Sequence, residues 1–353
     1  MHEPYARKLE LAGEHEKCGM ETCMRNRMDT ENYLPKHIGP ACGCEWHKPP
    51  LEDVVSLLSN GQIPVLLYHP PHDRLSSDKS SGTPYVAISH VWADGLGSTT
   101  EKGLPACQIK RLTTLTCQLV TNGAFWIDAL CIPETREMRK KAIGLMARTY
   151  RDATAVLVIV SGIRSIPCSA PREEKLLRIM SSGWMQRLWT LQEGILARKL
   201  IFEFSDGLLS LEDLLPVNEE HFNVLLLSLA SEIFRLKKHR DSLLNVSDVA
   251  RSLRWRSTSK PEDETLAISG LLNINASELI DYPPEQRIQM FLIRIQRLPR
   301  GIIFLSGLKM EVPGFRWAPR TLMRRASSSL GFGDSQALCT STGPHFRVYG
   351  LVF

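Results

Sequence analysis

Five side chains capable of chemistry stand at or just past the ends of two apolar stretches, residues 85–91 and 124–130. They are Ser89, His90 and Trp92 at the end of the first stretch, and Asp128 and Cys131 at the end of the second. Both stretches are predicted strands, and the carboxyl ends of strands in open α/β sheets are where ligands bind. The loop at 94–97 (DGLG) adds flexible backbone directly after the first strand. These residues predict a binding site at the rim of a sheet, although Asp128 equally suits a helix cap and Cys131 suits a small buried residue.

Glu193 adds a carboxylate on a helix that we predict over 173–197, with a break at 181–183. Helical spacing places an apolar stripe of this segment in the core, formed by Trp184, Leu188, Leu191 and Ile195. Glu193 lies on another stripe, with Trp189, Gln186 and Ser182. A carboxylate beside an indole makes a pocket wall. The alternative is a solvated carboxylate that pairs with Arg187 or Arg198, which adds little stability.

The first fifty residues carry a cluster of metal-binding side chains and little hydrophobic periodicity. Four of the nine cysteines, Cys18, Cys23, Cys42 and Cys44, stand close together in this segment. Four thiolates can surround a zinc ion and hold a segment that lacks a core of its own, and His37 or His47 can replace one of them. Neither spacing is that of a paired Cys-x-x-Cys site, so four unligated cysteines in a loosely ordered arm remain the alternative.

Composition describes a globular protein of mildly basic charge. The 353 residues are 43% hydrophobic, and 43 Lys and Arg against 38 Asp and Glu give a formal charge of +5. A basic stretch at 251–260 around Trp255 is followed at once by the acidic residues 262–264, which favours a solvated face or an intradomain ion-pair network over nucleic acid binding. The longest aliphatic run, 155–160, is too short to span a bilayer, and the N-terminus lacks a signal peptide. We therefore expect a soluble cytoplasmic protein with no membrane or nucleic acid partner.

Alternating strands and helices predict how the candidate residues are positioned. Strands are predicted over 63–68, 85–91, 124–130, 153–160 and 199–204, and helices over 51–58, 109–121, 137–150 and 173–197. This alternation predicts an α/β fold, with a parallel sheet flanked by helices. We divide the chain into a Cys-rich segment (1–50), a connecting segment (51–82) with a polar linker from 69 to 83, an α/β domain (83–206) and a mainly helical C-terminal region (207–353). A final strand over 346–353 ends without a closing segment, as in a truncated gene model.

Three segments resemble the hallmark blocks of heterokaryon incompatibility (HET) domains, in the right order and spacing. They are YVAISHVW at 85–92, FWIDALCI at 125–132 and RLWTLQE at 187–193. Residues 256–272 and 314–319 also resemble the downstream part of fungal HET proteins. His90 stands where the family often has Tyr, Ala93 where it often has Gly, and Pro133-Glu134 replaces Asn or Asp followed by Gln. The resemblance implies a fungal protein of self/non-self recognition and regulated cell death.

HET domains are in turn similar to TIR domains, which implies a TIR-like, flavodoxin-like fold. Residues 189–193 resemble the TIR Trp-Cys-x-x-Glu block, whose Glu cleaves NAD in the enzymatic members. By this resemblance Glu193 is the candidate catalytic residue, and NAD contacts are expected at Ser89, His90, Trp92, Asp128 and Trp189. A carboxylate can stabilise the oxocarbenium-like centre of this reaction, and an indole can stack on a ring. The competing hypothesis is a non-enzymatic signalling module that assembles with itself or with another incompatibility protein, since the chain has no glycine-rich dinucleotide loop. No nucleophile elbow, HExxH or P-loop supports other hydrolase or NTPase chemistry.

Overall fold

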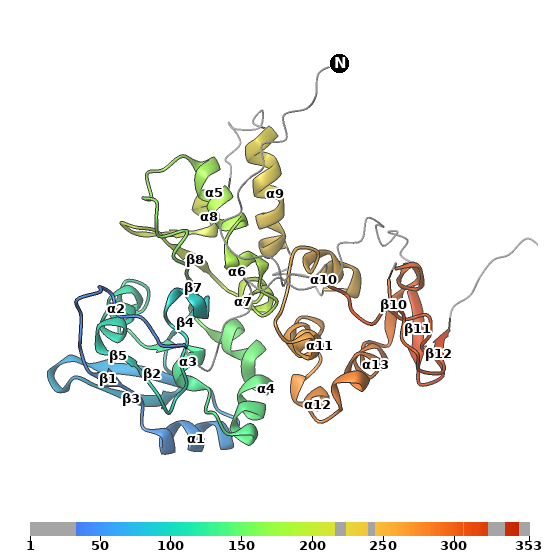
Figure 1. The fold of residues 1–353 in the computed structure, drawn as a ribbon, viewed down its shortest axis with the longest axis horizontal. Helices are drawn as coiled ribbons and strands as arrows, with labels where there is room; N and C mark the ends of the chain where they lie inside the picture. The colour runs from blue at the N-terminus through green and yellow to red at the C-terminus, as the bar shows by residue number, and fades with distance from the viewer. Residues whose placement is uncertain (1–32, 216–223, 239–243, 306, 324–335, 346–353) are drawn as a thin grey trace, which may run out of the picture.

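The computed structural model describes residues 33–215, 224–238, 244–305, 307–323 and 336–345 (Figure 1). The predicted ligands Cys18 and Cys23 and the predicted strand over 346–353 lie outside these residues. Within the described ranges, no helix has the length and apolar composition needed to cross a membrane.

A seven-stranded mixed sheet forms the centre of the fold, with the order β3-β2-β6-β4-β7-β8-β9. Its strands are β2 (Pro64–His69), β3 (Arg74–Lys79), β4 (Val86–His90), β6 (Phe125–Trp126), β7 (Ala155–Ile159), β8 (Leu200–Glu203) and β9 (Leu208–Ser210). The middle strands β6, β4, β7 and β8 run parallel, whereas β2 and β3 at one edge and β9 at the other are antiparallel to their neighbours. The predicted α/β fold is confirmed, and antiparallel edges extend its parallel centre.

The order of the parallel strands creates a topological switch point beside β4. From β4 the chain passes to β6 on one side, and it then crosses to β7 on the other side of β4. The register pairs Ser89 with Val158 and His90 with Ile159, so both residues lie where β4 and β7 end. Doubly wound sheets bind ligands at the carboxyl ends of strands at such a point. The fold therefore gives the first candidate residues the position that the sequence predicts.

Helices cover both faces of the sheet. They are α1 (Leu51–Ser59), α2 (Ala106–Cys117), α3 (Asp128–Cys131), α4 (Arg136–Asp152), α5 (Arg172–Met180), α6 (Gly183–Gln186) and α7 (Thr190–Ile195). Helix α2 contacts β2 and β6, while α4 contacts both α1 and α7. In Figure 1, α2 and α1 lie on opposite sides of β2 and β3. Because both faces are covered, β7 is buried along its whole length, which explains its unbroken apolar sequence.

Two segments differ from the sequence prediction. Strand β3 occupies the segment predicted as a polar linker, because its backbone pairs with β2 along the whole strand and Leu75 is buried beneath it. The strand predicted over 124–130 ends at Trp126, because Asp128 begins α3 and its Oδ1 accepts a hydrogen bond from the Ala129 backbone N–H at 2.7 Å. Asp128 is thus the first residue of α3 and not its predicted cap, since the N-cap position belongs to Ile127.

The helix predicted over 173–197 consists of α5, α6 and α7. The first interruption falls at the predicted residues 181–183, where the Ser182 hydroxyl caps α6 by accepting from Met185 N at 3.3 Å. A second interruption, which was not predicted, lies at Arg187, whose extended backbone (φ −81°, ψ 142°) pairs with Ser257. The second break means that Glu193 and Trp189 do not continue the helical stripe of Ser182.

The C-terminal region is mainly helical, as predicted, with one small sheet. Its helices are α8 (Leu211–Leu214), α9 (Val224–Lys238), α10 (Val246–Ser252), α11 (Glu264–Ser269), α12 (Ala276–Ile280) and α13 (Pro284–Ile295). The small sheet contains β10 (Arg297–Pro299), β11 (Gln336–Thr340) and β12 (Gly343–His345). Helix α9 packs on α5, α11 on α7 and α12 on α4. The C-terminal region therefore contacts α7, the helix that carries Glu193.

Short elements complete the fold. The 3-10 helices are η2 (Pro70–His72), η3 (Trp92–Asp94), η5 (Pro261–Asp263), η6 (Gly270–Leu272) and η7 (Arg300–Phe304). Strands β1 (Trp46–His47) and β5 (Leu104–Pro105) form a separate antiparallel pair.

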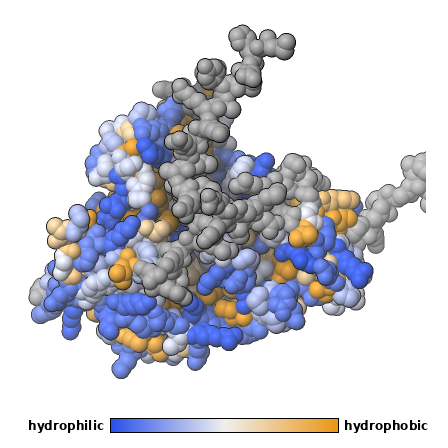
Figure 2. Space-filling view, in the orientation of Figure 1, coloured by the Kyte–Doolittle hydropathy of each residue, from blue (hydrophilic) through white to orange (hydrophobic). Residues whose placement is uncertain are grey.

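Figure 2 shows that the coloured part of this face is mostly hydrophilic, with hydrophobic residues in small groups. Such groups are usual on a globular surface.

Candidate functional site

Ser89 is the buried centre of the candidate site, at the carboxyl end of β4. The side chain is 0% exposed, and its Oγ donates a hydrogen bond to Glu193 Oε2 on α7. The indole Nε1 of Trp184 donates to the same Oγ at 2.6 Å. Because an indole is only a donor, the Ser89 hydroxyl accepts from Trp184 and directs its own hydrogen to Glu193. Trp184 is itself fixed by an edge-to-face contact with Phe202, at 5.8 Å between ring centroids.

Glu193 is a carboxyl group whose surroundings shift its pKa close to neutral pH. Burial and, to a smaller extent, the nearby charge of Asp128 raise its pKa to about 7, against the lowering effects of the Ser89 hydrogen bond and of Arg187. Tyr150 lies beside it, and burial together with the charge of Glu193 raises the pKa of that phenol well above its ordinary value. A carboxyl group with a pKa near 7 can exchange a proton at physiological pH, which suits general acid or base catalysis. The solvated, ion-paired alternative for Glu193 is therefore not what the structure shows.

The pKa of Asp128 is shifted in the opposite direction. His90 Nε2 lies 2.7 Å from Asp128 Oδ1, and the indole Nε1 of Trp92 donates to Oδ2 at 2.7 Å. Burial alone would raise the pKa of Asp128, but the charge and hydrogen bond of His90 and the bond from Trp92 outweigh it and lower the pKa to about 2. His90 Nδ1 is buried without a hydrogen-bond partner among the described residues. Asp128 therefore stays ionised, with 28% of its side chain exposed to solvent.

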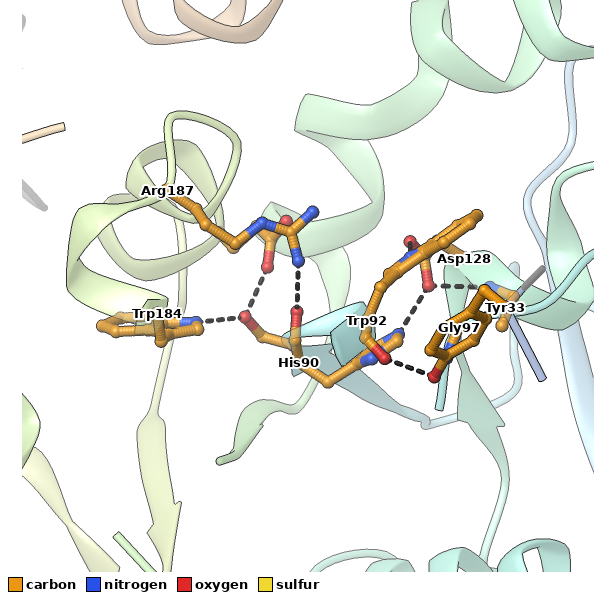
Figure 3. Close-up of polar contacts among 10 residues, drawn as sticks. Tyr33, His90, Trp92, Gly97, Asp128, Trp184 and Arg187 are labelled. Atoms are coloured by element: carbon orange, nitrogen blue, oxygen red, sulfur yellow. Dashed lines mark hydrogen bonds and ion pairs between the residues drawn. The ribbon is translucent and has the colours of Figure 1, made fainter. Parts of the chain in front are cut away.

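Arg187 links the two halves of this arrangement. Its guanidinium donates to the His90 backbone carbonyl at 3.2 Å, and its charge lowers the pKa of both Asp128 and Glu193. Figure 3 shows Arg187 and Trp184 on one side of His90, with Trp92 and Asp128 on the other. Two carboxyl groups whose pKa values are pushed apart can divide the roles of acid or base and charged stabiliser. The site thus combines a near-neutral carboxyl, an ionised carboxylate and a cation.

Residues 85–173 match the family model described as heterokaryon incompatibility protein (HET). The chain contains a HET domain. The match spans Ser89, His90, Trp92 and Asp128 and ends before Trp184 and Glu193. No curated protein and no solved structure shows a significant match to the chain.

The C-terminal region contacts the backbone of residues 186–190, at the third of the three predicted blocks. The buried Arg256 guanidinium donates to the Arg187 carbonyl at 2.6 Å and to Thr190 Oγ1 at 2.8 Å. Burial lowers the pKa of Arg256 to about 9. The Ser257 backbone N–H donates to the Gln186 carbonyl at 2.7 Å. Arg256 is thus not on a solvated face, which was one of the two predictions for the basic stretch. It donates instead to the backbone of the unpredicted break at Arg187.

Trp189 lies apart from the hydrogen-bonded network of Ser89. Its indole Nε1 donates to Asp263 Oδ2, on η5, at 3.1 Å. The indole that contacts Ser89 is that of Trp184, which the sequence places in the core without a polar role. The structure brings Ser89, His90, Trp92, Asp128 and Glu193 together, whereas the indole of Trp189 contacts the C-terminal region. The only sequence feature that could have indicated the contact of Trp184 with Ser89 is its position next to the predicted helix break.

The N-terminal segment holds the loop that follows β4. Tyr33 Oη donates to the Trp92 carbonyl and accepts from the Gly97 backbone N–H at 3.2 Å. The Lys36 backbone N–H donates to the Gly95 carbonyl at 2.9 Å. A Cβ on Gly97 would lie 2.8 Å from the Trp92 ring, so only glycine fits under that indole. The loop predicted as flexible is therefore held in place, and Trp92 is positioned toward Asp128.

A second constellation gathers four potential metal ligands. His37, Cys42, Cys44 and Cys107 place their ligand atoms within 4.8 Å of one another, so the group could hold a metal ion. Cys42 and Cys44 belong to the predicted set, His37 takes the predicted substitute role, and Cys107 from α2 was missed. His47, the other predicted substitute, pairs with Asp73 at 3.4 Å.

Cys131 is fully buried, in agreement with its predicted role as a small core residue.

Proposed function

We propose that this protein acts in the cytoplasm in fungal self/non-self recognition and regulated cell death, and that its HET domain hydrolyses NAD at the Ser89–Glu193 site. The observation that carries the proposal is that the pKa values of Glu193 and Asp128, which lie together at the switch point of the sheet, are shifted in opposite directions. The pKa of Glu193 is raised to about 7 and that of Asp128 is lowered to about 2. A structural ion pair would require neither the near-neutral carboxyl nor the partial exposure of Asp128.

The reaction breaks the bond between the nicotinamide nitrogen and C1′ of the ribose. The bonding electron pair goes to the pyridinium nitrogen, so nicotinamide leaves neutral and an oxocarbenium-like centre develops at C1′. Water attacks C1′ and its proton passes to the Glu193 carboxylate and then to solvent. NAD and water thus yield ADP-ribose, nicotinamide and one proton.

The neighbours of Glu193 fit this division of roles. The hydrogen bond from Ser89 fixes the position of the Glu193 carboxylate. The bond from Trp184 fixes the direction in which the Ser89 hydroxyl points. Asp128, ionised throughout the physiological range, supplies negative charge for the cationic centre. Arg187 is the partly buried cation at the site and suits the pyrophosphate of NAD.

The test uses the full-length chain at high concentration with NAD, and measures nicotinamide and ADP-ribose by chromatography. We expect release by the wild type, and a loss of about 100-fold or more in Glu193→Gln, as is typical when a general base is removed. Glu174→Gln is the matched control, since Glu174 lies on α5 and pairs with Arg178 at 3.8 Å on the surface. Equal release by the wild type and Glu193→Gln would remove Glu193 from its role.

A non-enzymatic signalling module is the second candidate. The contacts that hold the site from the N-terminal segment and from the C-terminal region favour it. Arg256 and Asp263 hold the third motif from the C-terminal region, and Tyr33 holds the loop after β4 from the other side. In this hypothesis the C-terminal region regulates whether the HET surface is exposed for assembly with itself or with a partner. Absence of NAD turnover, together with concentration-dependent assembly that increases in Trp189→Phe, would favour this candidate.

A further inference from the structure

Four side chains, three from the N-terminal segment and one from α2, bring their ligand atoms as close together as a metal site requires. His37 Nδ1 lies 3.4 Å from Cys44 Sγ and 3.7 Å from Cys107 Sγ, and Cys42 completes a set within 4.8 Å. Ligands about 2.3 Å from a central zinc ion, at tetrahedral angles, lie about 3.8 Å apart. The spacing of the donor atoms therefore matches what zinc requires. All four residues are partly buried, so the site is shielded but reachable.

Backbone structure brings these distant residues together. The pairing of β1 with β5 places His47 opposite Leu104, and the Ala106 N–H donates to the Glu45 carbonyl at 2.8 Å. Cys107 in the first turn of α2 is thereby fixed beside Cys44. Two backbone N–H groups point at the sulfurs, from Cys107 to Cys44 Sγ at 3.3 Å and from Ile38 to Cys107 Sγ at 3.4 Å. Such outer contacts orient metal ligands and stabilise thiolates.

The segment that carries three of the ligands has no hydrophobic core of its own. Between residues 33 and 48 no side chain is buried, and Leu34 and Ile38 are 74% and 56% exposed. Apolar burial is what normally compensates the entropy of ordering a chain. This segment nevertheless keeps a defined backbone, with Gln108 Nε2 donating to the Lys36 carbonyl at 2.7 Å. A bound metal would supply the missing stabilisation, as it does in small zinc domains.

We propose that His37, Cys42, Cys44 and Cys107 bind one zinc ion, which fastens residues 33–48 to α2 of the HET domain. Three thiolates and one imidazole in a tetrahedron select zinc among the common divalent metals. With no ligand position left open, the ion is structural. Its consequence for the HET domain runs through Tyr33 and Lys36, which hold the loop of Trp92 and Gly95. The proposal does not depend on NAD cleavage.

The first experiment measures zinc in the purified full-length chain by elemental mass spectrometry. We expect one zinc ion per chain in the wild type, and loss of zinc in Cys107→Ser and in Cys44→Ser. Cys117→Ser is the matched control, since Cys117 is exposed at the other end of α2, and it should retain the metal. The double variant Cys18→Ser/Cys23→Ser should also retain zinc. A wild-type chain without zinc, or zinc lost from the Cys18/Cys23 variant and kept in Cys107→Ser, would overturn the ligand set.

A second experiment keeps the wild-type sequence, so it remains informative if a variant fails to fold. Thiols are alkylated with N-ethylmaleimide, with and without a zinc chelator, and the modified cysteines are identified by mass spectrometry. Chelation should expose Cys42, Cys44 and Cys107 to the reagent, while Cys117 reacts in both conditions. Hydrogen exchange should also speed up over residues 92–97 when the ion is removed. Equal alkylation of Cys107 and Cys117 before chelation would contradict the proposal.

Discussion

Glu193→Gln should change how the stability of this protein depends on pH. The substitution keeps the size of the side chain and leaves an amide oxygen that can accept the Ser89 hydrogen bond, but it removes the ionisable group. Burial raises the pKa of Glu193 from its ordinary 4.5 to about 7 in the folded chain. Between these values the unfolded chain loses a proton that the folded chain retains. The stabilisation from a protonated Glu193 is therefore complete below pH 4.5 and is lost as pH rises through 7.

The size of the effect follows from the pKa difference. At about 1.4 kcal/mol for each unit, a shift of roughly 2.5 units corresponds to about 3 kcal/mol of folding free energy. Glu193→Gln lacks this pH-dependent loss, so its stability relative to the wild type should rise by up to about 3 kcal/mol between pH 5 and pH 8. A constant offset between the two proteins reports only the altered hydrogen bonding.

Thermal and urea unfolding of both proteins at intervals from pH 5 to pH 8 measures this difference. Glu174→Gln is the control, because Glu174 is a surface carboxylate whose loss should shift stability equally at every pH. A difference between Glu193→Gln and the wild type that stays flat across this range would refute the buried, near-neutral state of Glu193. It would also remove the main support for a proton-transfer role at this position.

Two further substitutions test the neighbours of Glu193. Trp184→Phe keeps the ring that packs on Phe202 but removes the donor to Ser89, and we expect a loss of about 1–3 kcal/mol in unfolding experiments together with slower NAD hydrolysis. Unchanged stability and turnover would show that the indole N–H does not position Ser89. Asp128→Asn removes the charge near the reacting centre, and nicotinamide release should fall by about 100-fold with little change in the KM for NAD. A rise in KM at unchanged kcat would instead assign Asp128 to ground-state binding.

The positions of the strands could be predicted from local sequence because burial on both faces leaves a clear pattern. The apolar run that forms β7 and the stretch that ends in Ser89 and His90 gave the central strands and the rim of the site. The polar strand β3 left no such pattern, since Leu75 is its only buried side chain. Its existence depends on backbone pairing with β2, which composition does not report.

The partners of the site residues were less predictable because they depend on tertiary contacts. The break at Arg187 is stabilised by Arg256 and Ser257, far along the chain, and it decides that Trp184 rather than Trp189 meets Ser89. Helical periodicity assumes a continuous helix and therefore gave Trp184 no polar contact. Cys107 was missed for a similar reason, because the pairing of β1 with β5 brings it beside Cys44 without any signal in the spacing of the cysteines.

The pH dependence of nicotinamide release by the full-length chain tests the central claim most directly. If Glu193 is the general base, kcat/KM for NAD should rise with pH through about 7, where this carboxyl group ionises. The rise should disappear in Glu193→Gln, whose residual rate should be at least about 100-fold lower, and it should persist in Glu174→Gln. A flat profile for the wild type, or a Glu193→Gln variant with the wild-type rate and profile, would contradict the assignment of Glu193 as the catalytic residue.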